Sequence, residues 1–302
     1  MNTIHIAICF NKTYIMPVAV LIQSIGANKG CEQIVIHAIS TEDLPDSSKR
    51  VLNEVAERNG MMLEYHVFTI PEYIISSFTN MRWWSPELFL KLYIPEILPS
   101  LSKVLVMDGD MVVCHSLLDI WREDIENYAL AGVVDSGFGL VLEVERDCYY
   151  NSGEYGYLNA GLLLMNLDYH REHNIHGRYI EWIEGNLERI GFLEQSVINN
   201  VVYDKKKILP LKYNLQFNSY VWKCKNNTYY SSVERSEAYF EPLVIHYIGS
   251  YKPWYKFCPH PYVNEWNRYL RQTPFSGYTK DFLGGVGIGE MSLRAIITMW
   301  LL

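Results

Sequence analysis

The feature that most constrains the fold is a regular alternation of short apolar segments with amphipathic ones in the first third of the chain. The apolar segments have strand length, and the segments between them carry apolar residues at helical spacing. Strands that alternate with helices in this way build a mostly parallel sheet with right-handed crossovers. The predicted strands are 4–10, 33–40, 62–68 and 103–107, and the predicted helices are 14–28, 46–59 and a stretch within 86–98.

The middle of the chain continues the pattern, whereas the last third mixes Pro, Gly and aromatic residues without clear periodicity. The chain has no internal repeat and no linker. One α/β domain with C-terminal additions is therefore expected. The further predicted elements are strands at 128–135 and 159–167 and helices at 175–189 and 194–203.

Composition narrows the class of protein. The formal net charge of −8 argues against a nucleic-acid partner. Six scattered cysteines without a C-x-x-C pair indicate reduced thiols in a cytosolic protein. The N-terminus has the pattern of a first strand and lacks that of a signal peptide, and no apolar run reaches the ~18 residues of a membrane-spanning helix. We therefore expect a cytoplasmic protein.

The segment "KVLVMDGDMVV" (103–113) places two carboxylates one residue apart at the end of a buried strand. In strand-like geometry Asp108 and Asp110 point the same way, and Gly109 lets the chain turn between them. Repulsion between the carboxylates is relieved by a hard divalent cation, for which their oxygens are suitable ligands. An ordinary turn is the alternative, but ligands of open α/β sheets bind at the carboxyl ends of strands.

The segment "HYIGSYKPW" (246–254) begins where a further predicted strand, in "EPLVIHY", ends at His246. His246 would supply a metal ligand and Lys252 a cation for phosphate, while Gly249 permits a close turn. The alternative is a strand-end histidine beside a solvated lysine.

Small and polar residues begin the predicted strand at 159–167. Asn159 offers a donor and an acceptor, and Ala160 and Gly161 allow a ligand to approach the backbone. Asp135 is a further carboxylate at the end of a predicted strand, "ALAGVVD". The alternative for Asn159, Ala160 and Gly161 is a simple turn before the strand, and the alternative for Asp135 is a surface position.

Glu194 and Gln195 stand at the start of a predicted helix. A glutamate in a first turn commonly does no more than offset the helix dipole, which is the alternative to a role in a site.

Seven ordered segments together resemble glycosyltransferase family 8, the retaining sugar-nucleotide transferases that include bacterial lipopolysaccharide glucosyl- and galactosyltransferases and glycogenin. The resemblance covers roughly residues 3–270, and "HxxGxxKPW" with "NAG" is its most specific part. It implies a GT-A fold, a Rossmann-like, mostly parallel sheet flanked by helices, over 1–270, and manganese bridging the donor diphosphate. The segments are "CFNKTY", "LKLYIPEILP", "VLVMDGDMVV", "AGVVD", "YLNAGLLLMNL", "LEQSVIN" and "HYIGSYKPW".

The resemblance also implies roles for individual residues. The implied ligands of Mn²⁺, or of Mg²⁺ as the alternative, are Asp108, Asp110 and His246. The implied donor-binding residues are Cys9, Asn11, Thr13 and Tyr14 in the uridine loop, Gly109, Gly249 and Lys252 at the diphosphate, and Lys91, Asp135, Asn159, Ala160 and Gly161 around the sugar. The implied catalytic residues are Gln195, Glu194 and Lys252. Relatives often have Arg at the position of Lys91 and Asp at that of Glu194.

The function that follows is a retaining hexosyltransferase that moves glucose or galactose from UDP-glucose or UDP-galactose to a bacterial surface glycan such as lipopolysaccharide. One alternative is a phosphohydrolase of the haloacid dehalogenase type, whose nucleophile strand also reads apolar-Asp-x-Asp. That type has its first Asp near the N-terminus and a later acidic pair, and neither is apparent here. A sugar-nucleotide-binding protein without transferase activity is the second alternative.

The end of the chain, "GEMSLRAIITMWLL" (289–302), completes a C-terminal extension over 271–302. It is too short to span a bilayer. Its apolar residues recur at helical spacing, which predicts an amphipathic helix. That helix either docks on the domain or lies on the inner face of the membrane beside a lipid-linked acceptor. The stripe consists of Leu293, Ile296, Ile297, Trp300 and Leu301.

Overall fold

The computed structural model describes residues 3–76, 85–136, 155–186, 190–216, 229–249, 252–256, 258 and 260–280. The predicted helix at 289–302 and residues 250–251 of the predicted phosphate loop lie outside these ranges. Within them, no helix combines the length and apolarity needed to cross a bilayer.

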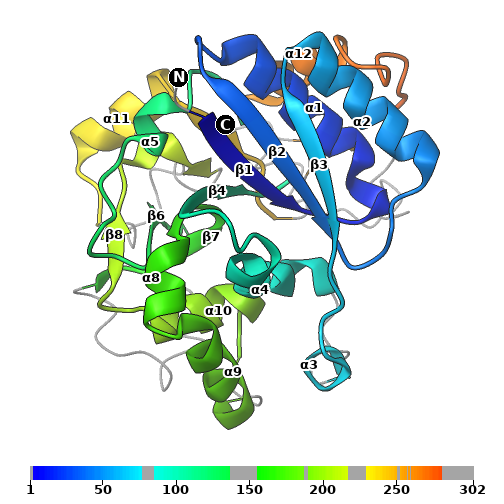
Figure 1. Ribbon diagram of the computed structural model, residues 1–302. Coiled ribbons are helices and arrows are strands. Elements are labelled where there is room, and N and C mark those ends of the chain that lie inside the picture. The colour runs from blue at the N-terminus through cyan, green and yellow to red at the C-terminus, as the bar shows by residue number, and fades with distance from the viewer. Residues whose placement is uncertain are drawn as a thin grey trace, which may run out of the picture.

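A seven-stranded sheet in the order β3-β2-β1-β4-β7-β6-β8 forms the centre of the molecule (Figure 1). β7 is antiparallel to both of its neighbours, β4 and β6, and the remaining pairs are parallel. The predicted mostly parallel sheet is therefore confirmed. Its strands are β1 (Thr3–Cys9), β2 (Gln33–Ser40), β3 (Met62–Val67), β4 (Lys103–Met107), β6 (Leu130–Val134), β7 (Leu158–Asn166) and β8 (Lys206–Ile208).

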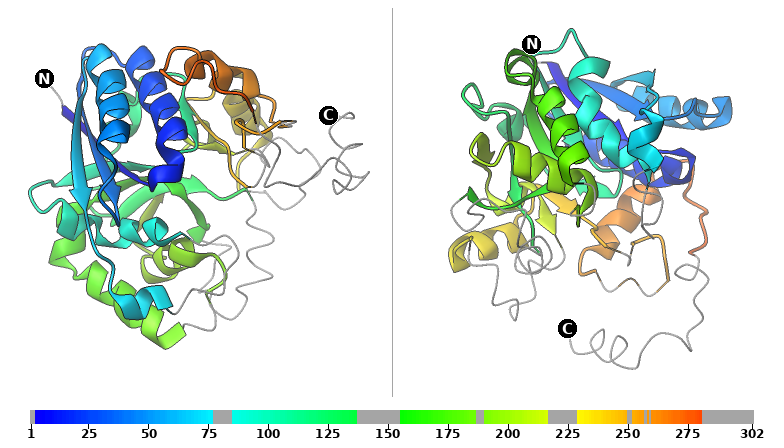
Figure 2. Two further views of the ribbon diagram at one scale, coloured as in Figure 1. Left: turned by 90° about the vertical axis from the view of Figure 1, so that its right-hand side faces the viewer. Right: turned by 90° about the horizontal axis from the view of Figure 1, so that it is seen from below.

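Helices cover both faces because successive side chains of a strand point to opposite faces of the sheet. Ile4, Ile6 and Ile8 pack in one core with apolar residues of α1 and α2. Ala7 belongs to a second core on the other face, with residues of α4, α9 and α10. Figure 2 shows α1 and α2 side by side against the first strands.

The helices that were predicted, α1, α2, α4, α9 and α10, begin and end close to the expected bounds, and the other α-helices were not predicted. The α-helices are α1 (Ile15–Asn28), α2 (Asp46–Arg58), α3 (Glu72–Ser76), α4 (Leu90–Ile97), α5 (Leu118–Trp121), α8 (Leu167–Glu172), α9 (Ile175–Asn186), α10 (Leu193–Val201), α11 (Ser232–Phe240) and α12 (Val263–Leu270). The 3-10 helices are η1 (Lys12–Tyr14), η2 (Pro86–Phe89) and η4 (Leu211–Tyr213).

A second, three-stranded sheet adjoins the first. It consists of β5 (Met111–Val113), β10 (Val244–His246) and β9 (Leu215–Gln216), with β10 in the middle. β4 and β5 are separated only by residues 108–110, so the Asp-Gly-Asp turn carries the chain from one sheet to the other. The turn therefore lies where the two sheets meet.

Candidate active site

The pairing of β10 with β5 brings the second predicted motif to the Asp-Gly-Asp turn. His246 is the register partner of Met111, the residue directly after Asp110. His246 Nε2 lies 3.2 Å from Oδ1 of Asp110 and 3.7 Å from Oδ2 of Asp108. One ligand atom from each of the three residues lies within 4.8 Å of the others. The three predicted metal ligands are thus neighbours, although 136 residues separate Asp110 from His246.

Asn214 fixes the orientation of the histidine ring. Its Oδ1 lies 3.1 Å from His246 Nδ1, while its Nδ2 donates to Asn159 Oδ1 at 3.0 Å. With the amide in this orientation, Nδ1 of His246 carries the proton and Nε2 turns its lone pair toward the aspartates. Asn214 is fully buried. Asn214 belongs to none of the sequence motifs and was therefore not among the predicted site residues.

The donor set suits a divalent cation. Among the described residues, Asp110 Oδ1 is one of the few buried side-chain oxygens that accept no hydrogen bond. A buried oxygen without a partner lowers the stability of the fold unless a cation or a water molecule contacts it. Two carboxylates and one imidazole fit Mn²⁺, while Mg²⁺ prefers oxygen ligands throughout.

Gly161 leaves room for this cluster. A Cβ atom built on Gly161 would lie 2.2 Å from Cε1 of His246 and 2.9 Å from Oδ2 of Asp108. The backbone of β7 therefore passes directly beside the candidate metal ligands, which only a glycine allows. Asp108 is anchored to the same residue, because its backbone N–H donates to the carbonyl of Gly161 at 2.8 Å.

Lys252 contacts the opposite oxygen of Asp110. Its ammonium group donates to Oδ2 of Asp110 and, at 2.8 Å, to the carbonyl of Tyr247. Burial raises the pKa of the Asp110 carboxyl, but the ammonium of Lys252 opposes burial, and that pKa is held well below its usual range. Lys252 is therefore a cation at the candidate metal site and not a solvated lysine.

Lys91 joins the aspartate turn to helix α10. It is 1% exposed, and its Nζ lies 2.7 Å from Asp108 Oδ1 and 3.0 Å from Glu194 Oε1. Nζ also donates to the carbonyl of Ala160 at 3.1 Å. Burial disfavours the ammonium form, but the two carboxylates prevail and raise the pKa of Lys91. Glu194 thus forms an ion pair with the buried Lys91, so it does more than offset the dipole of helix α10.

The side chain of Gln195 links the start of β7 to Asp135, the residue that follows β6. Its Oε1 accepts from the backbone N–H of Ala160 at 2.9 Å, and its Nε2 donates to Asp135 Oδ2 at 3.2 Å. Asn159 donates to the same oxygen of Asp135 at 2.9 Å. Asp135 is buried, so its surface alternative is excluded. Asn159 lies within β7, which excludes a turn before the strand.

The N-terminal loop borders the cluster through two of its predicted residues. Burial raises the pKa of Cys9 to about 12, with Lys91 opposing, so Cys9 is a thiol. A Cβ on Gly109 would lie 3.2 Å from the Tyr14 ring, which places Tyr14 against the aspartate turn. Asn11 accepts from the backbone N–H and the hydroxyl of Thr13, and so caps η1.

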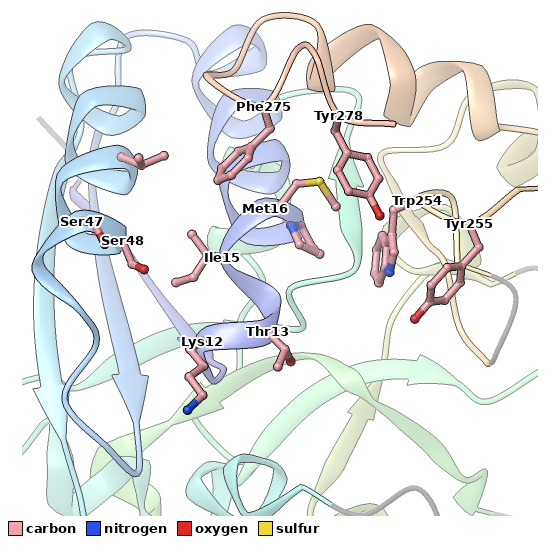
Figure 3. Close-up of a pocket in the computed structure, with 12 residues that line it drawn as sticks. Lys12, Thr13, Ile15, Met16, Ser47, Ser48, Trp254, Tyr255, Phe275 and Tyr278 are labelled. Carbon is pink, nitrogen blue, oxygen red and sulfur yellow. The ribbon is translucent and has the colours of Figure 1, made fainter. Parts of the chain in front are cut away.

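Beyond Tyr14 lies a cavity of about 580 Å³ (Figure 3). The Tyr14 ring packs edge-on against Trp254, which lines this cavity. None of the candidate metal ligands lines it, so the cavity adjoins the site without containing it. Its lining consists of Lys12, Thr13, Ile15, Met16, Pro17, Ser47, Ser48, Val51, Trp254, Tyr255, Phe275 and Tyr278.

The fold and the site define a glycosyltransferase of the GT-A type. The galactosyltransferase LgtC, solved with donor and acceptor sugar analogs, matches with a TM-score of 0.80 and 20% identity over 90% of this chain and 96% of its own. WbbM, a bifunctional glycosyltransferase, matches with a TM-score of 0.75 and 20% identity over 91% of this chain and half of its own.

The family model for glycosyl transferase family 8 matches residues 5–258, and the chain belongs to this family. General stress protein A of Bacillus subtilis is 24% identical over 90% of this chain and 94% of its own length. The lipopolysaccharide 1,3-galactosyltransferase of Salmonella typhimurium is 25% identical over 67% of this chain and 59% of its own length. The chain spans half of a Haemophilus influenzae relative, described as a putative glycosyltransferase, at 27% identity.

Proposed function

We propose that this glycosyltransferase moves glucose or galactose from a UDP-sugar to a bacterial surface glycan, with Mn²⁺ as its cofactor and with retention of configuration. The observation that carries the proposal is the meeting of Asp108, Asp110 and His246 where the two sheets adjoin, with Lys252 beside them. A relative that transfers galactose to lipopolysaccharide supports the choice of sugar and acceptor.

Asp108, Asp110 and His246 would hold the cation, which when bound supplies positive charge against the departing diphosphate. Lys252 would contribute a second positive charge to the same phosphates. Lys91 and Asn214 would keep the aspartate and the histidine in position. The chain's own residues would thus hold the cation in place, with Lys252 beside it, where the diphosphate would bind.

We infer that attack and departure occur on one face of the sugar. A double displacement needs a carboxylate nucleophile at the anomeric carbon. Gln195 is an amide, and the Glu194 carboxylate is engaged by the ammonium of Lys91. The acceptor hydroxyl would form the new bond to the anomeric carbon as the bond to the diphosphate breaks, and its proton would pass to a phosphate oxygen. Gln195 would stabilise the positive charge that develops on the sugar.

A donor panel tests this function. UDP, UDP-glucose, UDP-galactose and GDP-mannose are compared by thermal shift with and without Mn²⁺, because a ligand of the native state raises its melting temperature. We expect a Mn²⁺-dependent rise for UDP and for one UDP-hexose, followed by release of UDP from that donor. Binding without release, even with glycan acceptors present, would favour the non-catalytic binding protein. The family match already disfavours the phosphohydrolase.

We propose further that the protein works on the cytoplasmic side of the membrane, with its C-terminal segment against the lipid. Sedimentation with anionic liposomes tests this for the full chain and for a chain that ends at residue 288. Equal lipid binding by the two chains would remove the membrane role of 289–302.

A further inference from the structure

A second group of metal-ligating side chains lies on the sheet, away from the candidate active site. Its members are His37 of β2 and Glu64 and His66 of β3, which offer three ligand atoms within 4.8 Å of one another. His37 is the register partner of Glu64, and His66 is two residues further along β3 on the same face. The arrangement is therefore built by the pairing of β2 with the edge strand β3. We define these three residues as the histidine cluster.

We propose that the histidine cluster is a second metal site, which takes a transition-metal ion of the Zn²⁺ class. His37 Nδ1 lies 3.1 Å from His66 Nε2 and 3.3 Å from Glu64 Oε2, and the last two atoms are 3.9 Å apart. Tetrahedral Zn²⁺ with ligands at about 2.1 Å requires ligand atoms about 3.4 Å from one another. The three distances thus approximate one face of a zinc coordination tetrahedron.

His5 of β1 supplies the partner that a metal-bound histidine normally has. Its Nδ1 lies 3.0 Å from Nε2 of His37, on the side of the ring away from the cluster. When Nε2–H donates to His5, Nδ1 of His37 presents its lone pair toward His66 and Glu64. Such a second partner fixes the tautomer and the ring orientation of a ligand.

The cluster is open at one side. Side-chain exposure falls from 55% for Glu64 through 25% for His66 to 4% for His37. An ion can thus enter past Glu64, and water can complete its fourth position. Cys9, which borders the active site, lies four residues beyond His5 on β1, or about 13 Å along the strand. The cluster and the active site are therefore separate, and a bound ion would link the edge strand β3 to β2.

Cobalt serves as the optical probe, because tetrahedral Co²⁺ absorbs strongly in the visible and Zn²⁺ displaces it. The titration uses the full chain carrying Asp110→Asn, which removes a ligand of the other candidate site. We expect one Co²⁺ per chain with tetrahedral bands, and displacement by one equivalent of Zn²⁺. His66→Gln in the same background should weaken binding by at least about 10–100-fold, which is the loss that removal of a ligand's hydrogen-bond partner already causes. His173→Gln is the control, since His173 is exposed and lies outside the cluster.

Thermal melting with and without Zn²⁺ separates ligand loss from misfolding. The metal-free melting temperatures of the parent and the His66→Gln chain should agree, and Zn²⁺ should raise only that of the parent. Equal cobalt affinity in the two chains would overturn the proposal, as would absence of tetrahedral bands from the parent. These outcomes leave the proposed transferase function untouched, because that function depends on Asp110.

Discussion

The ammonium nitrogen of Lys91 lies 2.7 Å from Oδ1 of Asp108, so a candidate metal ligand is held by a fully buried cation. The same nitrogen lies 3.0 Å from Glu194. Through these two ion pairs, Lys91 of helix α4 links the residue that follows β4 to helix α10.

Replacing Lys91 by Met should lower the free energy of unfolding by about 3–5 kcal/mol, because the buried Glu194 and the partly buried Asp108 lose their counter-charge. Lys49→Met is the control: Lys49 pairs with the exposed Asp43, and such pairs contribute about 0–1 kcal/mol. Urea denaturation measures the free energy of unfolding of both variants. Adding Glu194→Gln to Lys91→Met should recover part of the loss, and strictly additive effects would contradict the coupling.

Gly161→Ala should abolish Mn²⁺-dependent UDP binding, because the new methyl group would collide with the His246 ring. Gly185→Ala is the matched control. Nothing lies within 4 Å of a Cβ at Gly185, and alanine in helix α9 should stabilise by about 0.5–1 kcal/mol. Calorimetric titration with UDP compares the two variants. Wild-type affinity in Gly161→Ala would show that β7 does not constrain the histidine.

Asn214→Ala should weaken Mn²⁺ binding by about 10–100-fold, since His246 loses the acceptor that sets its tautomer. Asn200→Ala is the control, because Asn200 is also buried but bonds only within helix α10, to the carbonyl of Ser196. Electron paramagnetic resonance of free Mn²⁺ gives both affinities. If the two variants lose affinity equally, the effect is general destabilisation and not the orientation of His246.

Gln195→Ala should slow transfer without eliminating it, because Gln195 stabilises charge and forms no covalent bond. The product should carry an α-linked sugar by NMR. Glu194→Gln provides the sharper comparison. Complete loss of transfer in that variant, together with a glycosylated Glu194 trapped in the wild type, would replace the one-face mechanism by a double displacement. A β-linked product would remove retention itself.

Local patterns were sufficient to predict six of the seven strands of the central sheet, because each of these apolar runs has strand length. The three-residue strand β8 was not predicted. Asp108 and His246 were predicted as site residues because each directly adjoins such a strand. The ion pair of Lys91 with Glu194 was not predicted, since 103 residues separate the partners and no periodicity reports a tertiary contact. Asn214 was missed for the same reason.

Helices α11 and α12 were not predicted in the aromatic last third of the chain. For α11 a signal was present: Ser231 and Glu234 form a capping box, a pattern that sequence shows as Ser-x-x-Glu. The path of the Asp-Gly-Asp turn between two sheets was also hidden, because β5 reads as a continuation of β4 until its pairing with β10 is known.

The proposed function requires that Asp110 holds a cation that in turn holds the donor diphosphate. Calorimetric titration of UDP into the wild type, with Mn²⁺ and then with EDTA, tests it most directly. Asp110→Asn is the test variant, and Asp119→Asn, at an exposed position of α5, is the control. We predict tight binding that EDTA and Asp110→Asn each abolish, while Asp119→Asn binds as the wild type does. Equal UDP affinity with and without EDTA, or in Asp110→Asn, would contradict the account.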